Sequence, residues 1–261
     1  MHMLPQAPRE PDVSAPWREP LVFERVVVIG GGCYGSWYTQ QLSKAIAREA
    51  VRIGEIVVVD RSASCQVAGA LADNSYAGAP VRLVVQPWRE YLTEWLAGGS
   101  EALRQDAMVP SPLMPHLCLD WLMDRAQARW PGRTVRVEPL PSVPDMPWER
   151  AAPDGRHYVS FATWTCPVNC IEPAKCPATR GPRDWSLPPS VRAFAAKQGN
   201  AIDATCIFHC SHRVYGVGMI DAAALLAADA EVASQSAEQA IHVLVGTVSH
   251  CHGALGLLSV T

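Results

Sequence analysis

A short apolar strand that runs directly into a glycine-rich turn constrains the fold of this chain most. Residues 25–29 (RVVVI) are β-branched and apolar, which is typical of a strand buried on both faces of a sheet. Residues 30–35 (GGGCYG) follow at once, and apolar residues then recur at helical spacing as far as Ala50. Apolar runs at 56–60 and 81–85 predict two further strands. This order predicts the opening of a doubly wound, mostly parallel α/β sheet.

The glycines of this turn, Gly30, Gly32 and Gly35, match the pattern G-x-G-x-x-G. The first allows the tight turn, the second lets a pyrophosphate approach the backbone, and the third lets the helix pack on the strand. Asp60 ends the next strand, where a carboxylate would hold a ribose hydroxyl. In these residues, over about 25–86, the chain resembles the NAD(P)-binding Rossmann superfamily. The resemblance implies a nucleotide crevice beside the first strand.

Three features near this turn depart from the usual pattern or extend it. Asp60 follows Gly35 by more than the ~20 residues that are usual. Cys33 and Tyr34 fill the two variable positions and bring bulk close to the expected phosphates. Arg61, directly after Asp60, is suited to a 2′-phosphate, so the resemblance implies NAD or NADP as the cofactor.

Composition bounds the class of protein. The chain of 261 residues is 49% hydrophobic and 18% charged, which predicts a folded globular protein. A net charge of −3 gives no electrostatic basis for binding nucleic acid or an anionic membrane. No apolar run reaches the ~18–20 residues that span a bilayer. Residues 1–22 are rich in proline and lack the apolar stretch of a secretion signal, so we expect an extended arm and a cytoplasmic location.

The rest of the chain predicts a continuation of the same α/β domain. We expect helices at 88–97, 116–129 and 219–232, and strands at 134–137, 157–163, 204–208 and 241–248. Residues 23–261 are therefore expected to form one Rossmann-like domain. A Cys-rich insert at about 164–190 interrupts it.

Nine cysteines are many for a chain that we expect in a reducing compartment, and their number is odd. Disulfide frameworks belong to small secreted domains, so these thiols indicate metal binding or redox chemistry instead. Six of the cysteines and five of the eight histidines fall in the last hundred residues.

The insert carries the clearest metal signal. Cys166, Cys170 and Cys176 have the spacing C-x3-C-x5-C, and proline follows two of them. The segment has no helical or strand periodicity, so a bound metal or cluster is needed to organise its backbone. Cys-Pro also occurs in ferredoxin loops, but the spacing is neither that of a ferredoxin nor that of a zinc ribbon. We favour a [4Fe–4S] cluster, with zinc and metal-free redox thiols as the alternatives.

Further ligands are expected from strand ends. Cys210 and Cys251 follow the strands predicted at 204–208 and 241–248. In one parallel sheet the carboxyl ends of all strands meet at the same edge, where Cys33 also lies after the first strand. Adding Cys210, Cys251 or both to the three insert cysteines gives the four thiolates that a cluster or a structural zinc prefers.

The histidines His209, His212, His250 and His252 lie in the same two loops and are candidates for ligation or proton transfer. The sequence therefore supports two functions. The first is an oxidoreductase with an iron–sulfur cluster beside a dinucleotide crevice, which works with a redox partner protein or as a homo-oligomer. The second is a non-catalytic zinc- or cluster-binding accessory or sensor protein.

Overall fold

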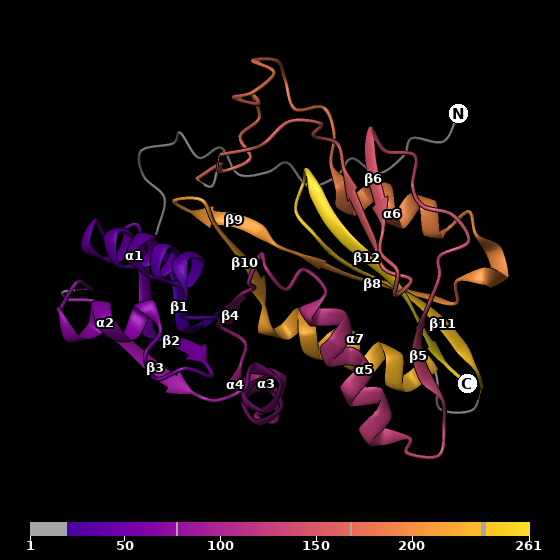
Figure 1. Ribbon diagram of the computed structural model, residues 1–261, viewed down its shortest axis with the longest axis horizontal. Coiled ribbons are helices and arrows are strands. Elements are labelled where there is room, and N and C mark those ends of the chain that lie inside the picture. The colour runs from indigo at the N-terminus through magenta and orange to yellow at the C-terminus, as the bar shows by residue number, and fades with distance from the viewer. Residues whose placement is uncertain (1–19, 77, 168, 236–238) are drawn as a thin grey trace.

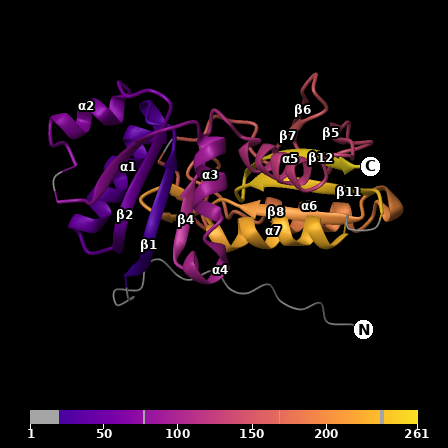
Figure 2. The same ribbon diagram turned by 90° about the horizontal axis from the view of Figure 1, so that it is seen from below.

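The fold of this chain is mixed α/β, with strands in two mixed sheets that lie next to each other (Figures 1 and 2). The computed structural model describes residues 20–76, 78–167, 169–235 and 239–261. Most of the arm expected at 1–22 lies outside the described residues, and Leu21 and Val22 already belong to the first strand. Among the described helices, none combines the length and the apolar character needed to cross a lipid bilayer.

The first sheet contains the glycine turn. Its strand order is β3-β2-β1-β4-β10-β9. The first four of these strands run parallel, and β10 pairs antiparallel with both of its neighbours, β4 and β9. The bounds are β1 (Leu21–Ile29), β2 (Val51–Asp60), β3 (Val81–Val85), β4 (Asp106–Val109), β9 (Ser211–Val214) and β10 (Val217–Asp221). The runs predicted at 25–29, 56–60 and 81–85 thus form neighbouring parallel strands.

Helices cover both faces of this sheet because successive side chains of a buried strand point to opposite faces. Val26 and Val28 pack on the side of α1 (Cys33–Ala47), whereas Val27 and Ile29 pack on the side of α3 (Trp88–Leu96). The helices α2 (Gln66–Ala72), α4 (Gly99–Ala102) and α7 (Ala222–Gln235) also lie near this sheet, whereas α5 (Leu117–Arg129) packs on the second sheet. The helices expected at 88–97 and 116–129 are confirmed.

The second sheet has the order β6-β7-β12-β11-β8, and β5 also pairs with β12. Its strands are β5 (Val135–Glu138), β6 (Trp148–Ala151), β7 (His157–Ser160), β8 (Ala204–His209), β11 (Ile241–Val248) and β12 (His252–Val260). One face, which includes Phe208 and Val243, shares a continuous core with α5, α7 and the first sheet. The other face, which includes Leu244 and Leu257, is covered by α6 (Leu187–Ala195).

The expectation of a single parallel sheet is wrong for the strands at 134–137, 157–163, 204–208 and 241–248, which belong to the second sheet. The physical reason is the short turn after β11, which folds β12 back beside it as an antiparallel hairpin. The helix expected at 219–232 begins at Ala222, because 217–221 forms β10.

Although these strands form a separate sheet, the predicted convergence of their carboxyl ends is still observed. Strands β7 and β11 both pair antiparallel with β12, so they run in the same direction, and β8 is parallel to β11. The carboxyl ends of these three strands therefore meet at one edge of the second sheet. Cys33 does not share that edge, because it follows β1 in the first sheet.

A buried histidine before α5 gives a prediction for stability against pH. The His116 ring packs on Tyr158, with 5.1 Å between ring centroids, and burial together with the charge of Arg156 lowers the pKa of His116 to about 4. In the unfolded chain the pKa is ~6.5, so acid protonates the unfolded state first. The stability that neutral His116 contributes is therefore fully present above pH ~6.5. About 3 kcal/mol of it is lost as the pH falls toward the pKa of His116 in the folded protein.

Chemical denaturation between neutral pH and pH ~4 measures this effect. His116→Leu should remove that part of the pH dependence. The assignment is wrong if the variant loses stability with acid as steeply as the wild type does.

Candidate thiol centre and glycine-loop crevice

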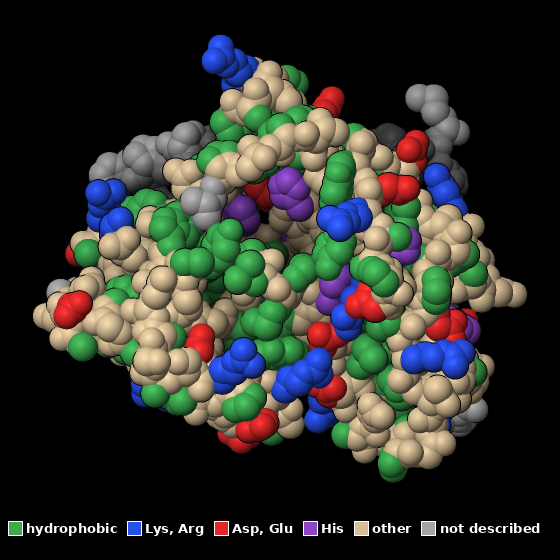
Figure 3. Space-filling view, viewed as in Figure 1, with side chains coloured by type: hydrophobic (Ala, Val, Ile, Leu, Met, Phe, Trp, Pro, Cys, Tyr) green, Lys and Arg blue, Asp and Glu red, His purple; other side chains and the backbone are tan. Residues whose placement is uncertain are grey.

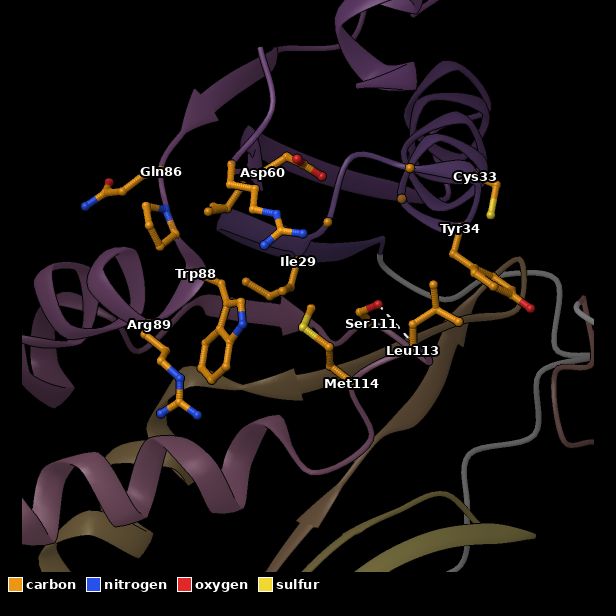
Figure 4. Close-up of a pocket in the computed structure, with 16 residues that line it drawn as sticks. Ile29, Cys33, Tyr34, Asp60, Gln86, Trp88, Arg89, Ser111, Leu113 and Met114 are labelled. Atoms are coloured by element: carbon orange, nitrogen blue, oxygen red, sulfur yellow. Dashed lines mark hydrogen bonds between the residues drawn. The ribbon is translucent and has the colours of Figure 1, made fainter. Parts of the chain in front are cut away.

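A crevice of about 510 Å³ opens beside the glycine turn (Figure 4). Its walls come from the carboxyl ends of β1, β2 and β3 and from the loop after β4. In Figure 4, Tyr34 and Leu113 lie at one end of the crevice, and Trp88 and Arg89 lie toward the other. The predicted cofactor-binding residues Gly30, Gly32, Gly35 and Asp60 all line it, as does Arg61.

Each predicted glycine has a distinct geometry in the turn. Gly30 has a φ of +91°, in the region that favours glycine, and its N–H donates to the Val59 carbonyl at 2.8 Å. A Cβ on Gly35 would lie 1.8 Å from the Gly30 carbonyl oxygen, so α1 can begin this close to β1 only without a side chain there. A Cβ on Gly32 would meet no atom of the described residues within 4 Å, so this position opens into the crevice.

Asp60 holds the glycine turn in place. Its Oδ2 accepts a hydrogen bond from the Gly31 N–H at 2.7 Å, and its Oδ1 accepts one from the Ser62 N–H at 2.8 Å. The carboxylate therefore fixes the glycine turn, which forms one wall of the crevice, against the end of β2. It also lines the crevice, at the place where the sequence predicts a contact with ribose.

A second and smaller cavity is lined by four cysteines: Cys166, Cys170, Cys176 and Cys251. The first three come from the cysteine segment, residues 164–186, of which Val168 lies outside the described residues. Cys251 comes from the turn between β11 and β12. The segment runs across the top of Figure 1, beyond the carboxyl ends of β8 and β11. The predicted insert and the predicted strand-end cysteine therefore share one cavity.

Cys176 sits in a tight turn that favours its thiolate. Backbone N–H groups of Thr179 and Ala178 donate to its sulfur, and together with the Thr179 hydroxyl they outweigh burial and lower the pKa of Cys176. The Cys176 N–H donates to the Gly181 carbonyl at 2.9 Å, and the Arg180 N–H donates to the Cys176 carbonyl at 2.8 Å. N–H groups around a sulfur are the arrangement that stabilises a metal-bound or cluster-bound thiolate.

Two other cavity thiols, Cys166 and Cys251, favour the protonated form. Burial raises the pKa of Cys251 to about 12, against the opposing hydrogen bond that the Trp185 indole N–H donates to its sulfur at 3.3 Å. Burial and the neighbouring Cys170 raise the pKa of Cys166. The Trp164 indole N–H is buried in the same wall, and its hydrogen bond to the Cys166 thiol opposes this rise. Both indoles thus offer N–H groups to sulfur.

Cys210 does not join this cavity. A Cβ on Gly218 would lie 2.6 Å from the Cys210 sulfur, so the thiol faces β10 and not the cysteine segment. Its backbone N–H donates to the Val248 carbonyl at 2.8 Å, which sets this orientation at the corner between β8 and β9. Burial raises the pKa of Cys210 to about 12, and the side chain packs against the main core.

The four candidate histidines lie at the same edge as the thiol cavity, and Figure 3 shows histidine side chains around a hollow near the middle of that face. The rings of His209 and His250 meet edge to face, with centroids 4.7 Å apart. His212 Nδ1 donates to the Cys170 carbonyl at 2.5 Å. Two serines orient the others, with His250 Nδ1 2.8 Å from Ser186 Oγ and His252 Nδ1 2.9 Å from Ser160 Oγ.

Glu172 is a site residue that the sequence reasoning missed. It is 8% exposed and accepts hydrogen bonds from the Ser249 hydroxyl at 2.6 Å, the His250 N–H at 3.0 Å and the Cys251 N–H at 3.2 Å. Burial alone would raise the pKa of Glu172, but the charge of His212 and these hydrogen bonds hold it below its usual value. The available signal was an acidic residue between two candidate ligands.

The cysteine segment also packs on the hairpin that joins the two sheets. A Cβ on Gly216, at the tip between β9 and β10, would lie 3.1 Å from the Asn169 backbone, and the φ of Gly216 is +77°. Strand β10 in turn pairs with β4, next to β1. This hairpin is therefore a direct structural link between the thiol cavity and the sheet that carries the glycine turn.

Comparison with known proteins identifies one family. A family model described as "Uncharacterized protein, C-terminal domain" (AF_1314_C) matches residues 118–261, more than half of the chain. The chain therefore belongs to this family. The match includes the cysteine segment, Cys251 and every strand of the second sheet, and it leaves out the glycine turn. No curated protein and no solved structure matches.

Proposed function

We propose that this protein is a redox protein or oxidoreductase that holds a Cys-ligated iron–sulfur cluster beside a dinucleotide-type crevice. One observation carries the proposal. Cys251, from the turn after β11, lines the same cavity as Cys166, Cys170 and Cys176. Four thiolates are the ligand set of a [4Fe–4S] cluster. When bound, such a cluster supplies one-electron transfer.

The surroundings of the cavity fit an anionic metal–thiolate group. Backbone N–H groups surround the Cys176 sulfur, and the Trp185 indole donates to that of Cys251. The buried Trp164 indole N–H is a further donor, to the Cys166 thiol. In the described part of the chain, no three Cys, His, Asp or Glu side chains are placed to hold a metal ion as they stand. Binding would therefore draw the sulfurs inward as the thiols ionise.

The crevice supports the dinucleotide half of the proposal. The parallel strand order β3-β2-β1-β4 supports it, because it matches the first four positions of the doubly wound order 3-2-1-4-5-6. The volume of the crevice, about 510 Å³, suits a cofactor site. Gly32 leaves room for the backbone approach of a pyrophosphate at the start of α1. A nicotinamide cofactor, NAD or NADP, would give the cluster a two-electron partner.

The cavity also supports a second candidate, a non-catalytic zinc-binding accessory or sensor protein. The tight turn at Cys176 and the closed set of four thiols suit a structural Zn²⁺ as well as a cluster. This candidate needs no dinucleotide in the crevice. It would explain the thiol cavity as a stabiliser of the cysteine segment.

Visible absorption and metal analysis of the anaerobically purified protein separate these candidates. A cluster predicts a brown protein with iron and acid-labile sulfide, whose colour bleaches on reduction with dithionite. Zinc predicts a colourless protein with zinc that resists removal by weak chelators. Protein that carries neither after anaerobic purification would contradict both. Bleaching by NADH or NADPH would support the link to the crevice.

A further inference from the structure

We propose that Glu172 is the positioning residue that locks Cys251 into the thiol cavity. This inference rests on the proposed function, because it concerns how the fourth ligand reaches the same site. Glu172 lies between Cys170 and Cys176 in the cysteine segment, whereas its hydrogen-bond donors all belong to the turn after β11.

The carboxylate binds this turn with both of its oxygens. Oε1 accepts from the Ser249 hydroxyl at 2.6 Å and from the Cys251 N–H at 3.2 Å, and Oε2 accepts from the His250 N–H at 3.0 Å. One side chain thus fixes the backbone of the residue that supplies the fourth sulfur. These are charge-assisted hydrogen bonds in a buried place, where they are stronger than at a surface.

The backbone conformation of Glu172 also supports this positioning role. Its φ of 49° lies in the left-handed region, which non-glycine residues rarely adopt. Its N–H lies 3.4 Å from the Cys170 sulfur as a donor, and Pro173 fixes the next φ. A costly backbone conformation at a buried carboxylate persists when the surrounding contacts require it. Here those contacts join the neighbour of one candidate ligand to the backbone of another.

Electrostatics do not explain why a carboxylate stands here. A second negative charge beside thiolates opposes their ionisation, and after burial the Glu172 charge is among the influences that raise the pKa of Cys251. The charge therefore costs the site some of its affinity for metal. What the carboxylate provides is geometry, because it gathers three donors of one turn at a single point.

The test compares four purified proteins: the wild type, Glu172→Ala, Cys251→Ala and the double variant. Metal content and chelator competition give the affinity, and electron paramagnetic resonance gives the type of cluster. Loss of an outer-shell partner typically weakens metal binding about 10–100-fold, and we expect Glu172→Ala to do so. It should give the same altered spectrum as Cys251→Ala. The double variant should bind no more weakly than Cys251→Ala alone, because both changes remove the same ligand.

Two further variants keep the test sharp. Glu172→Gln retains one acceptor oxygen but turns an amide N–H toward the His250 N–H, so its affinity should fall between those of the wild type and Glu172→Ala. Asp106→Asn is the matched control, since Asp106 is another buried carboxylate, 3% exposed, which accepts the Trp95 indole N–H far from the thiol cavity. It should leave metal affinity unchanged. If Glu172→Ala does not fold, Ser249→Ala removes the shortest of the three bonds and carries the comparison.

The outcomes separate this inference from the proposed function. A wild type that carries no metal overturns both. If the wild type binds metal, Cys251→Ala loses it and Glu172→Ala keeps full affinity, the inference alone is overturned. Additive losses in the double variant also overturn it, because they would mean that Glu172 acts on something other than Cys251.

Discussion

Cys176→Ala is expected to empty the metal site and to destabilise the cysteine segment more than any other single thiol change. Cys176 has the lowered pKa among the cavity thiols, and its sulfur is held by backbone N–H groups of Thr179 and Ala178. Between 164 and 186 the described backbone contains one isolated bridge, Lys175 with Pro182, and no regular helix or strand. Under the proposed function, metal binding would supply much of the order of this segment; structural Zn²⁺ in zinc-finger peptides contributes ~10–16 kcal/mol.

Metal analysis and thermal unfolding of the variant measure this effect. We expect metal content to fall to background and several kcal/mol of the metal's contribution to be lost. Cys166→Ala and Cys170→Ala should act in the same direction, because the three thiols are predicted to work as a unit. Full metal occupancy in all three single variants would contradict the proposed thiol centre.

Two cysteines outside the cavity, the buried Cys206 and the partly buried Cys210, provide matched controls. Cys206 lies inside β8 with its S–H directed at the Ala228 carbonyl at 4.0 Å, and Cys210 packs against β10. Alanine at either position removes a small buried group and should cost about 1–2 kcal/mol of stability. Neither change should alter the metal content. Loss of metal in Cys210→Ala would show that this thiol reaches the site after all.

Local pattern predicted the strands around the glycine turn well, but it missed β4, β9 and β10 of the first sheet and the separate, mixed topology of the second sheet. Strand, glycine turn and helix follow one another along the chain around Gly30 and Gly35, so short-range signals are sufficient there. Strand β12 contains Gly253 and Gly256, which read as turn residues in a sequence. In the structure they are points of close packing, because a Cβ would lie 2.5 Å from Val248 Cγ1 and 2.5 Å from Leu119 Cδ2 respectively.

In the candidate site, too, local pattern predicted some residues, whereas contacts between distant parts of the chain determine the others. The spacing of the insert cysteines is local and predicted a shared site, and the end of β11 correctly placed Cys251 at the edge where the insert lies. Cys210 follows a strand in the same way, but a backbone bond to Val248 turns it toward β10. An acidic residue between Cys170 and Cys176 was visible in the sequence, but the partners of Glu172 could not be predicted, because they lie 77 to 79 residues further along the chain.

Gly32→Leu is expected to weaken dinucleotide binding strongly without unfolding the protein. Among the described residues nothing lies within 4 Å of a Cβ at Gly32, so the leucine side chain fits, but it occupies the crevice where a pyrophosphate would approach the backbone. Affinity for NADH or NADPH should fall at least tenfold, which corresponds to ~1.4 kcal/mol. Isothermal titration calorimetry gives the affinity, and thermal unfolding shows that the fold is retained.

Gly35→Ala is the contrasting variant, because it changes the packing of the turn and not the opening of the crevice. Its Cβ would lie 1.8 Å from the Gly30 carbonyl oxygen, a backbone atom that cannot move away cheaply. We expect a loss of about 3 kcal/mol of stability, at the upper end for overpacking. If Gly32→Leu unfolds the chain, the open geometry at Gly32 is wrong. If the wild type binds neither NAD(H) nor NADP(H), the crevice is not a dinucleotide site and the thiol centre stands alone.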